Sequence, residues 1–134
     1  MIFVDSSVWI SYFNGMSTPE TDRLDQLLAT TRVALGDLVL LEVLQDFRQD
    51  KDYETAKGLL LSLEVFDLLC QDMAIKAARN YRVLRSRGIT IRKSADVVIA
   101  TFCIENDISL LHADRDFRPF EAHMQLRSLF PVTD

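Results

Sequence analysis

The chain has 134 residues, of which 49% are apolar and 26% are charged, and its formal net charge at pH 7 is −5. This length predicts one domain over residues 1–134, and the composition is that of an ordinary globular protein. No stretch approaches the ~20 consecutive apolar residues of a membrane span. Asp5 interrupts the first apolar run and no basic segment precedes it, so we expect no signal peptide, no membrane contact and a cytoplasmic location.

Strand and helix patterns alternate along the chain. In chain order they predict a strand over residues 1–4, helices over 8–13 and 18–28, a strand over 32–35, helices over 38–47 and 53–63, a strand over 65–70, helices over 72–87 and 94–106, a strand over 108–111, a loop or short helix over 114–120, and an edge strand over 125–130. Alternation of this kind implies parallel crossovers. The expected fold class is therefore α/β, with helices on both faces of a small sheet.

Two of the helices carry specific expectations at their ends and faces. Asp72 is the expected N-cap of the helix over 72–87, and Ser94 that of the helix over 94–106. The expected buried face of the former helix consists of Ala74, Ala77, Ala78, Tyr81 and Leu84.

Cysteine and histidine do not form a zinc motif in this sequence. Cys70 and Cys103 each lie inside an apolar run, far from each other and from paired ligands, so we expect both to be buried thiols. His112 follows an apolar run and is expected to be packed or partly exposed rather than a metal ligand.

Acidic residues recur where strands end. Asp5 follows the first strand, and Asp114 and Asp116 follow the strand over 108–111. Asp96 lies in the first turn of a helix, and Glu42 lies in mid-helix among leucines. Because ligands of parallel sheets gather at the carboxyl ends of strands, these groups are expected to converge.

Each acidic residue also has an ordinary explanation. Asp5 can cap a helix, Asp96 can complement a helix dipole, and Glu42 can be exposed or salt-bridged. Asp114 and Asp116 can be turn residues. A convergent cluster, by contrast, is costly without a cation, since packed carboxylates repel one another. Oxygen-only ligands suit Mg²⁺ or Mn²⁺, and such ions support hydrolysis of phosphodiester bonds by an activated water.

The chain is acidic overall, but one segment of it is strongly basic. Residues 73–95 contain no Asp or Glu, but they contain seven of the fifteen basic residues. These are Lys76, Arg79, Arg82, Arg85, Arg87, Arg92 and Lys93. The segment is either a solvated helix face or a phosphate-binding surface, and the absence of interleaved acids favours the second interpretation.

Four segments resemble one known family. Residues 2–10 (IFVDSSVWI) resemble the opening of PIN-domain ribonucleases, especially the VapC-type toxins of bacterial toxin–antitoxin pairs. Residues 41–43 (LEV), 93–100 (KSADVVIA) and 110–117 (LLHADRDF) resemble the family's later acidic positions, in the same order along the chain.

The resemblance implies a fold, an activity and partners. The fold would be a PIN-like three-layer α/β/α sandwich with a small, mainly parallel central sheet, and the activity would be Mg²⁺- or Mn²⁺-dependent endoribonuclease. The catalytic acids would be Asp5, Glu42, Asp96, Asp114 and Asp116, with Asp5, Asp96 and Asp114 as metal ligands and Asp116 as an accessory acid. The RNA contacts would come from Ser6, Arg79, Arg82, Arg85, Arg92 and Lys93. The family commonly forms homodimers and is inhibited by a small antitoxin. The alternative is a catalytically idle PIN-like module that binds RNA or a partner protein.

Overall fold

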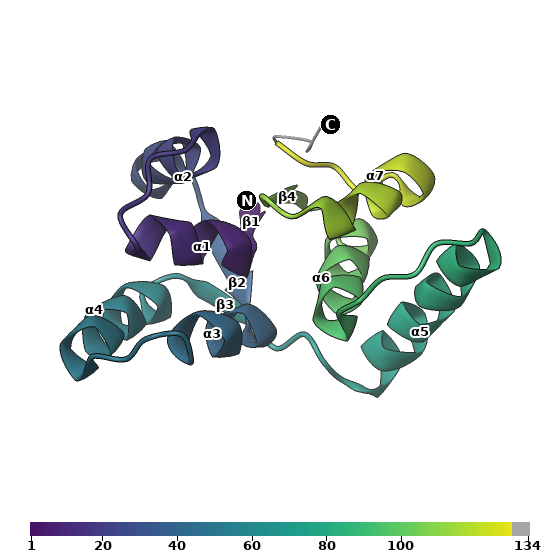
Figure 1. Ribbon diagram of the computed structural model, residues 1–134, viewed down its shortest axis with the longest axis horizontal. Coiled ribbons are helices and arrows are strands. Elements are labelled where there is room, and N and C mark those ends of the chain that lie inside the picture. Colours follow the sequence, from purple (N-terminus) through teal and green to yellow (C-terminus); the bar gives the residue numbers. More distant parts are fainter. Residues whose placement is uncertain (130–134) are drawn as a thin grey trace.

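A four-stranded parallel sheet forms the centre of the protein, whose computed structural model describes residues 1–129 (Figure 1). The strands are β1 (Ile2–Val4), β2 (Val33–Gly36), β3 (Glu64–Phe66) and β4 (Ser109–Leu111). Their order in the sheet is β3-β2-β1-β4, and each pair of neighbours is parallel. The chain therefore steps outward from β1 to β3 and then returns across the sheet to β4.

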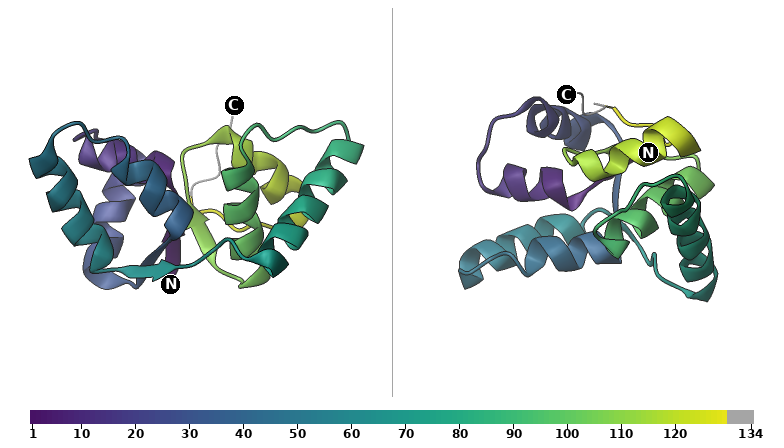
Figure 2. Two further views of the ribbon diagram at one scale, coloured as in Figure 1. Left: turned by 90° about the horizontal axis from the view of Figure 1, so that it is seen from below. Right: turned by 45° about the vertical axis from the view of Figure 1, so that its right-hand side comes forward.

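Helices cover both faces of this sheet. They are α1 (Ser6–Phe13), α2 (Pro19–Thr30), α3 (Asp37–Leu44), α4 (Asp50–Leu61), α5 (Gln71–Ser86), α6 (Ser94–Glu105) and α7 (Arg118–Met124), with a 3₁₀ turn, η1 (Arg115–Phe117), before α7. Figures 1 and 2 show α1–α4 grouped on one side of the molecule and α5–α7 on the other. This grouping follows from the strand order, because right-handed crossovers that run in opposite directions lie on opposite faces. The α/β class and the three-layer arrangement are confirmed.

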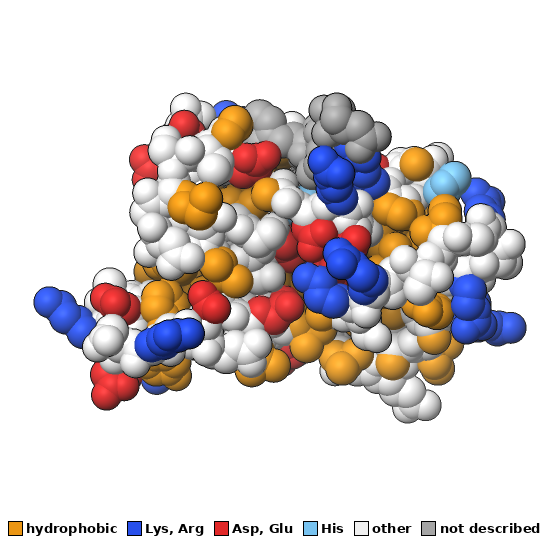
Figure 3. Space-filling model, in the orientation of Figure 1, with side chains coloured by type: hydrophobic (Ala, Val, Ile, Leu, Met, Phe, Trp, Pro, Cys, Tyr) orange, Lys and Arg blue, Asp and Glu red, His pale blue; other side chains and the backbone are white. Residues whose placement is uncertain are grey.

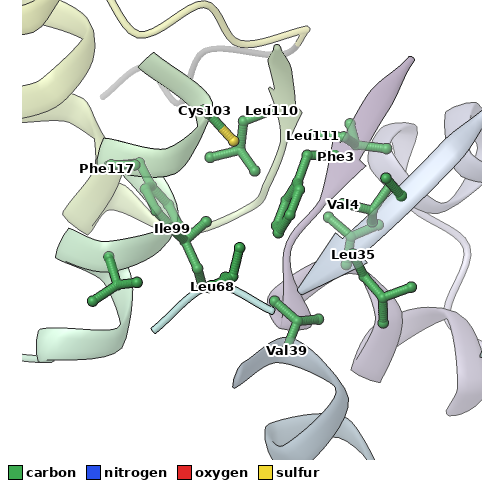
Figure 4. Close-up of a cluster of buried hydrophobic side chains, with 14 of the residues drawn as sticks. Phe3, Val4, Leu35, Val39, Leu68, Ile99, Cys103, Leu110, Leu111 and Phe117 are labelled. Atoms are coloured by element: carbon green, nitrogen blue, oxygen red, sulfur yellow. The ribbon is translucent and has the colours of Figure 1, made fainter. Parts of the chain in front are cut away.

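The core is formed where α6 packs on the strands. Phe3 of β1, Ile99 of α6 and Leu110 of β4 are fully buried and lie together with Cys103 and Phe117 (Figure 4). Helix α6 is buried at every position from Asp96 to Thr101, so the helix enters the core within its first turn, at Asp96. A polar side chain in that turn must be functional or paired, since an unpaired buried charge is costly.

Several boundaries differ from the expectations. The expected strand over 65–70 is shorter, because the backbone N–H of Leu68 donates to Asp37 Oδ1 at 3.1 Å and not to a neighbouring strand. The expected edge strand over 125–130 is reduced in its described part to one bridge between Leu110 and Ser128, and Phe130 lies outside the described residues. Helix α3 ends at Leu44, before the expected residue 47.

Two expected caps and one expected burial are wrong. The N-cap of α5 is Cys70, two residues before the expected cap, and Asp72 lies inside the first turn. Lys93, not Ser94, is the N-cap of α6. Cys70 is exposed, because it precedes α5 at the surface of the protein, whereas Cys103 is buried as expected.

The inner face of α5 is narrower than its sequence pattern predicts. Met73, Ala77 and Leu84 are buried, but Ala74 and Ala78 border a groove at the surface and are exposed. None of the helices within residues 1–129 combines the length and the apolar character that a membrane crossing requires.

Candidate active site

The order of the strands determines where the acidic residues meet. Strand β1 lies between β2 and β4, and the crossover from β1 to β2 runs along the sheet in the opposite direction to the crossover from β3 to β4. The carboxyl ends of β1 and β4 therefore flank the point at which the direction of winding reverses, where parallel sheets bind ligands. The Asp5 N–H donates to Leu111 O at 3.0 Å, which joins the two strand ends directly.

Asp5 is the N-cap of α1 and is held in one orientation by Ser7. Its Oδ2 accepts hydrogen bonds from the Ser7 backbone N–H at 3.0 Å and from the Ser7 hydroxyl at 2.7 Å. The side chain is buried, with 2% of Asp5 exposed, and Oδ1 has no hydrogen-bond partner. Burial raises the pKa of Asp5, and the two hydrogen bonds from Ser7 offset part of that rise. The expected role as a cap is therefore real, but it uses only one of the two oxygens.

Asp96 is a buried acid of the cluster with a strongly raised pKa. It lies in the first turn of α6, is 2% exposed, and its Oδ2 has no hydrogen-bond partner. The Nζ of Lys93 lies 3.8 Å from that oxygen. Burial, followed by the negative charge of Asp5, raises the pKa of Asp96 from 3.8 to about 7. Such a rise in pKa indicates a carboxyl group that the fold buries beside another carboxylate.

Asp114 and Asp116 complete the cluster from the segment after β4. Asp114 is the N-cap of η1, and its Oδ1 accepts a hydrogen bond from the Asp116 N–H at 2.9 Å. Its Oδ2 lies 3.4 Å from Lys93 Nζ. Asp116 forms an ion pair with Arg92 at 3.2 Å. Ligand oxygens of Asp96, Asp114 and Asp116 all lie within 4.8 Å of one another.

Glu42 approaches the cluster from α3. It is partly buried, and its Oε1 accepts a hydrogen bond from the Ser6 hydroxyl at 3.2 Å. Burial and then the charge of Asp5 raise the pKa of Glu42. Ser6 therefore orients an acid of the site, and the carboxylate among leucines has a hydroxyl partner.

The structure brings together all five acids that the sequence singles out. Among the described residues, however, Asp5 and Glu42 lie outside the group whose oxygens are mutually within 4.8 Å, and Asp116 lies inside it. The assignment of Asp5, Asp96 and Asp114 as the metal ligands thus stays a prediction, and the geometry adds Asp116 to the candidates.

Ser7 is a site residue that the sequence did not single out. Besides its two bonds to Asp5, its Oγ accepts a hydrogen bond from the Ala113 N–H at 3.0 Å. One hydroxyl thereby connects the segment after β1 to the segment after β4. A serine two residues after a capping aspartate is the local pattern that could have indicated the bond to Asp5. The bond to Ala113 spans 106 residues and has no local pattern.

The residues present fit a divalent cation. Two buried carboxylate oxygens, Asp5 Oδ1 and Asp96 Oδ2, have no hydrogen-bond donor. Arg92 and Lys93 form ion pairs with the cluster at its rim. The ligands are carboxylate oxygens, which Mg²⁺ and Mn²⁺ prefer. The Lys93 ammonium, shared between Asp96 and Asp114, shows that this position attracts positive charge.

The basic residues fall into two groups. Arg92 and Lys93 contact the acidic cluster, and Figure 3 shows Lys and Arg side chains beside the acidic patch at the centre of the face. Arg79, Arg82 and Arg85 are exposed on α5, where Arg82 and Arg85 border a groove of about 480 Å³ between α5 and α6. The single basic segment of the sequence is therefore divided between the cluster and a neighbouring helix.

Similarity to known proteins covers nearly the whole chain. Residues 2–121 match the PIN domain family. Ribonuclease VapC11 of Mycobacterium tuberculosis is 30% identical over 122 residues, which are 87% of this chain and 89% of that protein. Among solved structures, VapBC2 of Rickettsia felis bound to a promoter DNA fragment matches with a TM-score of 0.72 at 18% identity, covering 96% of this chain and 97% of that one. The sarcin-ricin-loop-cleaving toxin VapC20 of M. tuberculosis matches with a TM-score of 0.68 at 20% identity, covering 89% and 94%.

Proposed function

The chain belongs to the PIN domain family, alongside VapC ribonucleases, and from this premise we propose that it is a Mg²⁺- or Mn²⁺-dependent endoribonuclease, the toxin of a toxin–antitoxin pair. The observation that carries the proposal is the group formed by the carboxylates of Asp96, Asp114 and Asp116, together with two buried oxygens that lack a donor, Asp5 Oδ1 and Asp96 Oδ2. A module that only binds RNA gains nothing from such repulsion. A cation-dependent enzyme benefits from the clustered carboxylates, because their negative charge binds the cation and the cation in turn offsets their repulsion.

The cation would be held by Asp96, Asp114 and Asp116, with Asp5 beside them. When bound, such a cation neutralises negative charge at the scissile phosphate and lowers the pKa of a bound water, which is the chemistry that phosphodiester hydrolysis needs.

The chain's own residues would supply orientation and proton transfer. Ser7 fixes Asp5 through Oδ2, which leaves Oδ1 free to accept a proton from the attacking water. Glu42, oriented by Ser6, would place a second carboxylate beside the path of that water. Attack by water needs no covalent link between the enzyme and the RNA.

Arg92 and Lys93 would bind the RNA backbone next to the reacting phosphate. Both side chains are more than half exposed and already pair with acids of the cluster. Once the carboxylates are neutralised by a cation, the two basic groups are free to turn to phosphate oxygens. The cations of α5, Arg79, Arg82 and Arg85, would extend this contact along the strand.

Protein partners are a further part of the proposal. A toxin–antitoxin complex from Klebsiella pneumoniae shares this fold with a TM-score of 0.72, and we propose a small antitoxin as the partner of this chain. An apolar groove of about 390 Å³ between α3 and α4, lined by Leu40, Leu41 and Leu44, offers it a docking surface, with Leu41 58% exposed. We also propose a homodimer, for which light scattering would give twice the 15.3 kDa of one chain.

The first experiment measures metal binding, because it needs no knowledge of the RNA. Thermal melts of the wild type and Asp96→Asn are recorded with Mg²⁺, Mn²⁺ and Ca²⁺. We expect Mn²⁺ at saturating concentration to raise the wild-type Tm by roughly 5–10 °C, and to leave Asp96→Asn nearly unchanged. Asp72→Asn, which removes an exposed carboxylate of α5, is the matched control and should respond like the wild type.

The second experiment measures cleavage of single-stranded RNA. Cleavage should require Mg²⁺ or Mn²⁺, stop on chelation, and fall at least about 100-fold in Asp96→Asn. RNA binding with a steep salt dependence but no response to metal would overturn the proposal and favour the catalytically idle module.

A further inference from the structure

His112 is a buried imidazole between the acidic cluster and α7. It directly follows β4, none of it is exposed, and its ring packs on Phe117 with 4.8 Å between ring centroids. Nothing in the proposed chemistry uses this side chain. A buried polar ring needs hydrogen-bond partners for both nitrogens, and here both nitrogens have them.

The two nitrogens contact different parts of the fold. Nδ1 lies 3.2 Å from the backbone N of Asp114, and Nε2 lies 2.8 Å from Oε2 of Glu121 on α7. The Ser128 hydroxyl lies 3.2 Å from the same Nε2. A backbone N–H can only donate, so Nδ1 must accept through its lone pair and the ring proton must be on Nε2. That proton points at the Glu121 carboxylate, which makes Glu121 the group that selects this tautomer.

We propose that Glu121 and His112 are a positioning pair that orients Asp114 for cation binding. The inference rests on the proposed function of the carboxylate cluster. It concerns how one ligand of that cluster is held, and it assigns roles to two residues outside the cluster.

The turn between β4 and η1 is anchored at successive amides. The Ala113 N–H donates to Ser7 Oγ at 3.0 Å, and the Asp114 N–H donates to His112 Nδ1. The Asp114 side chain is fixed in turn, because its Oδ1 accepts the Asp116 N–H at 2.9 Å. Only Oδ2 then remains for the cluster, 3.4 Å from the Lys93 ammonium. Removing the bond at Nδ1 frees the backbone that carries this oxygen.

The opposite tautomer would break the arrangement at both ends. It would place a proton on Nδ1 against the Asp114 N–H, and it would leave the Glu121 carboxylate facing a bare nitrogen. Groups that orient the ligands of a metal commonly change its affinity by about 10–100-fold when replaced. The pair therefore has a measurable consequence beyond packing.

The test uses two substitutions of His112, each of which keeps the hydrogen bond of one ring nitrogen and removes that of the other. His112→Asn keeps an acceptor for the N–H two residues ahead, as in an Asx turn, but cannot reach Glu121. His112→Gln reaches toward Glu121 but lacks an acceptor at the Nδ1 position. Mn²⁺ affinity, measured by titration calorimetry, should stay within about threefold of wild type in His112→Asn and fall at least about tenfold in His112→Gln. Both variants are expected to lose thermal stability.

A spectroscopic measurement on the metal-free wild type is independent of these variants. Because the chain has two histidines, long-range ¹H–¹⁵N spectra can identify the His112 nitrogens, and we expect Nδ1 to be bare and Nε2 to be protonated. Glu121→Gln should admit the second tautomer and weaken Mn²⁺ binding about tenfold. Ser128→Ala, which removes the longer contact to the same nitrogen, should do neither.

The outcomes are distinguishable from those of the proposed function. If the wild type binds Mn²⁺ and the affinities of His112→Asn and His112→Gln fall together with stability, the pair is structural only and the inference is wrong. A protonated Nδ1 in the wild type also overturns it. If the wild type binds no Mn²⁺, the proposed function fails, whereas the tautomer still tests the hydrogen bonds of the pair.

Discussion

Among the acidic side chains of the site, the oxygens are satisfied unequally. In Asp5, Oδ2 accepts the hydrogen bond that fixes the carboxylate, and Oδ1 accepts none. In Asp114, Oδ1 accepts the fixing hydrogen bond, and Oδ2 takes no part in it. Asp96 has a buried oxygen without a donor and a pKa raised to about 7. The fold therefore orients these acids rigidly without neutralising them, which is the arrangement expected of ligands made ready for a cation.

The raised pKa of Asp96 predicts how stability depends on pH without metal. Its pKa rises from 3.8 to about 7 on folding, so the folded protein retains a proton that the unfolded chain has released. Stability is therefore greatest at low pH with respect to this group and falls as pH rises from about 4 to about 7. The shift of about 3 pKa units sets an upper limit of about 4 kcal/mol.

Asp96→Asn should remove this dependence. In urea denaturation with a chelator present, we expect the wild type to lose about 2–4 kcal/mol more than the variant between these pH values. At neutral pH the variant should be the more stable protein. Asp72→Asn should follow the wild type across the whole range. A variant that is less stable than the wild type at every pH would mean that Asp96 is a structural group of α6.

At the scale of elements, a tight contact behind β2 places α3 and its Glu42. Gly36 is the last residue of β2 and the N-cap of α3. A Cβ at this position would overlap the side chain of Leu68, which is buried. Leu68 cannot move away freely, because its N–H is bonded to Asp37 Oδ1. Only glycine allows the strand, the helix and this segment to meet.

Gly36→Ala should therefore destabilise the protein by about 1–3 kcal/mol, since the core is overpacked. Leu68→Ala alone should cost about 2–5 kcal/mol, but the double variant should cost less than the sum, because each change relieves the other. Denaturation of the four proteins measures this coupling. Gly58→Ala on α4 is the matched control, since its Cβ would meet no atom within 4 Å and should be neutral or stabilising. Strict additivity at positions 36 and 68 would contradict the account.

At the scale of the whole molecule, charge is separated rather than mixed. The chain has 20 acidic and 15 basic residues, yet residues 73–95 contain seven basic residues and no Asp or Glu. In the fold this segment forms most of α5, the loop that follows it and the first residues of α6, next to the acidic cluster. An anionic protein can bind RNA on such a face, because screening confines each charge's influence to about 10 Å.

Binding of RNA should therefore depend on the cations of α5 more than on net charge. In a catalytically inactive Asp96→Asn background, replacing Arg79, Arg82 and Arg85 by Gln should weaken binding of a labelled single-stranded RNA. The slope of log K against log salt should fall in magnitude by about 2, at about 0.7 per lost contact. Fluorescence anisotropy at several salt concentrations measures both quantities.

A matched triple variant makes the comparison specific. Arg23→Gln, Arg48→Gln and Lys51→Gln change the net charge equally, but these exposed residues lie on α2, before α4 and on α4, among the helices of the opposite side. Their loss should leave the slope nearly unchanged. Equal effects of the two triple variants would show that RNA responds to the total charge of the protein and not to the α5 face.

Much of this protein is determined by local sequence. The alternation of apolar runs with amphipathic segments predicts the order of strands and helices, because burial on one face imposes a period of about 2 or 3.6 residues. The same reasoning places Asp5 and Asp114 after strands, and the rule for parallel sheets brings those strand ends together. The proximity of the strand ends that carry Asp5 and Asp114 was thus accessible from the sequence.

Other features depend on contacts between residues that are distant in the chain, and only the tertiary structure decided them. The Ser7 hydroxyl connects to Ala113, Cys70 is exposed at the start of α5 despite its apolar neighbours, and Glu121 on α7 selects the tautomer of His112. The strand expected over 65–70 is shortened by a bond to Asp37. Periodicity reports which face of an element is buried, but a hydrogen bond depends on where another element places its donor, and that is determined when the layers pack.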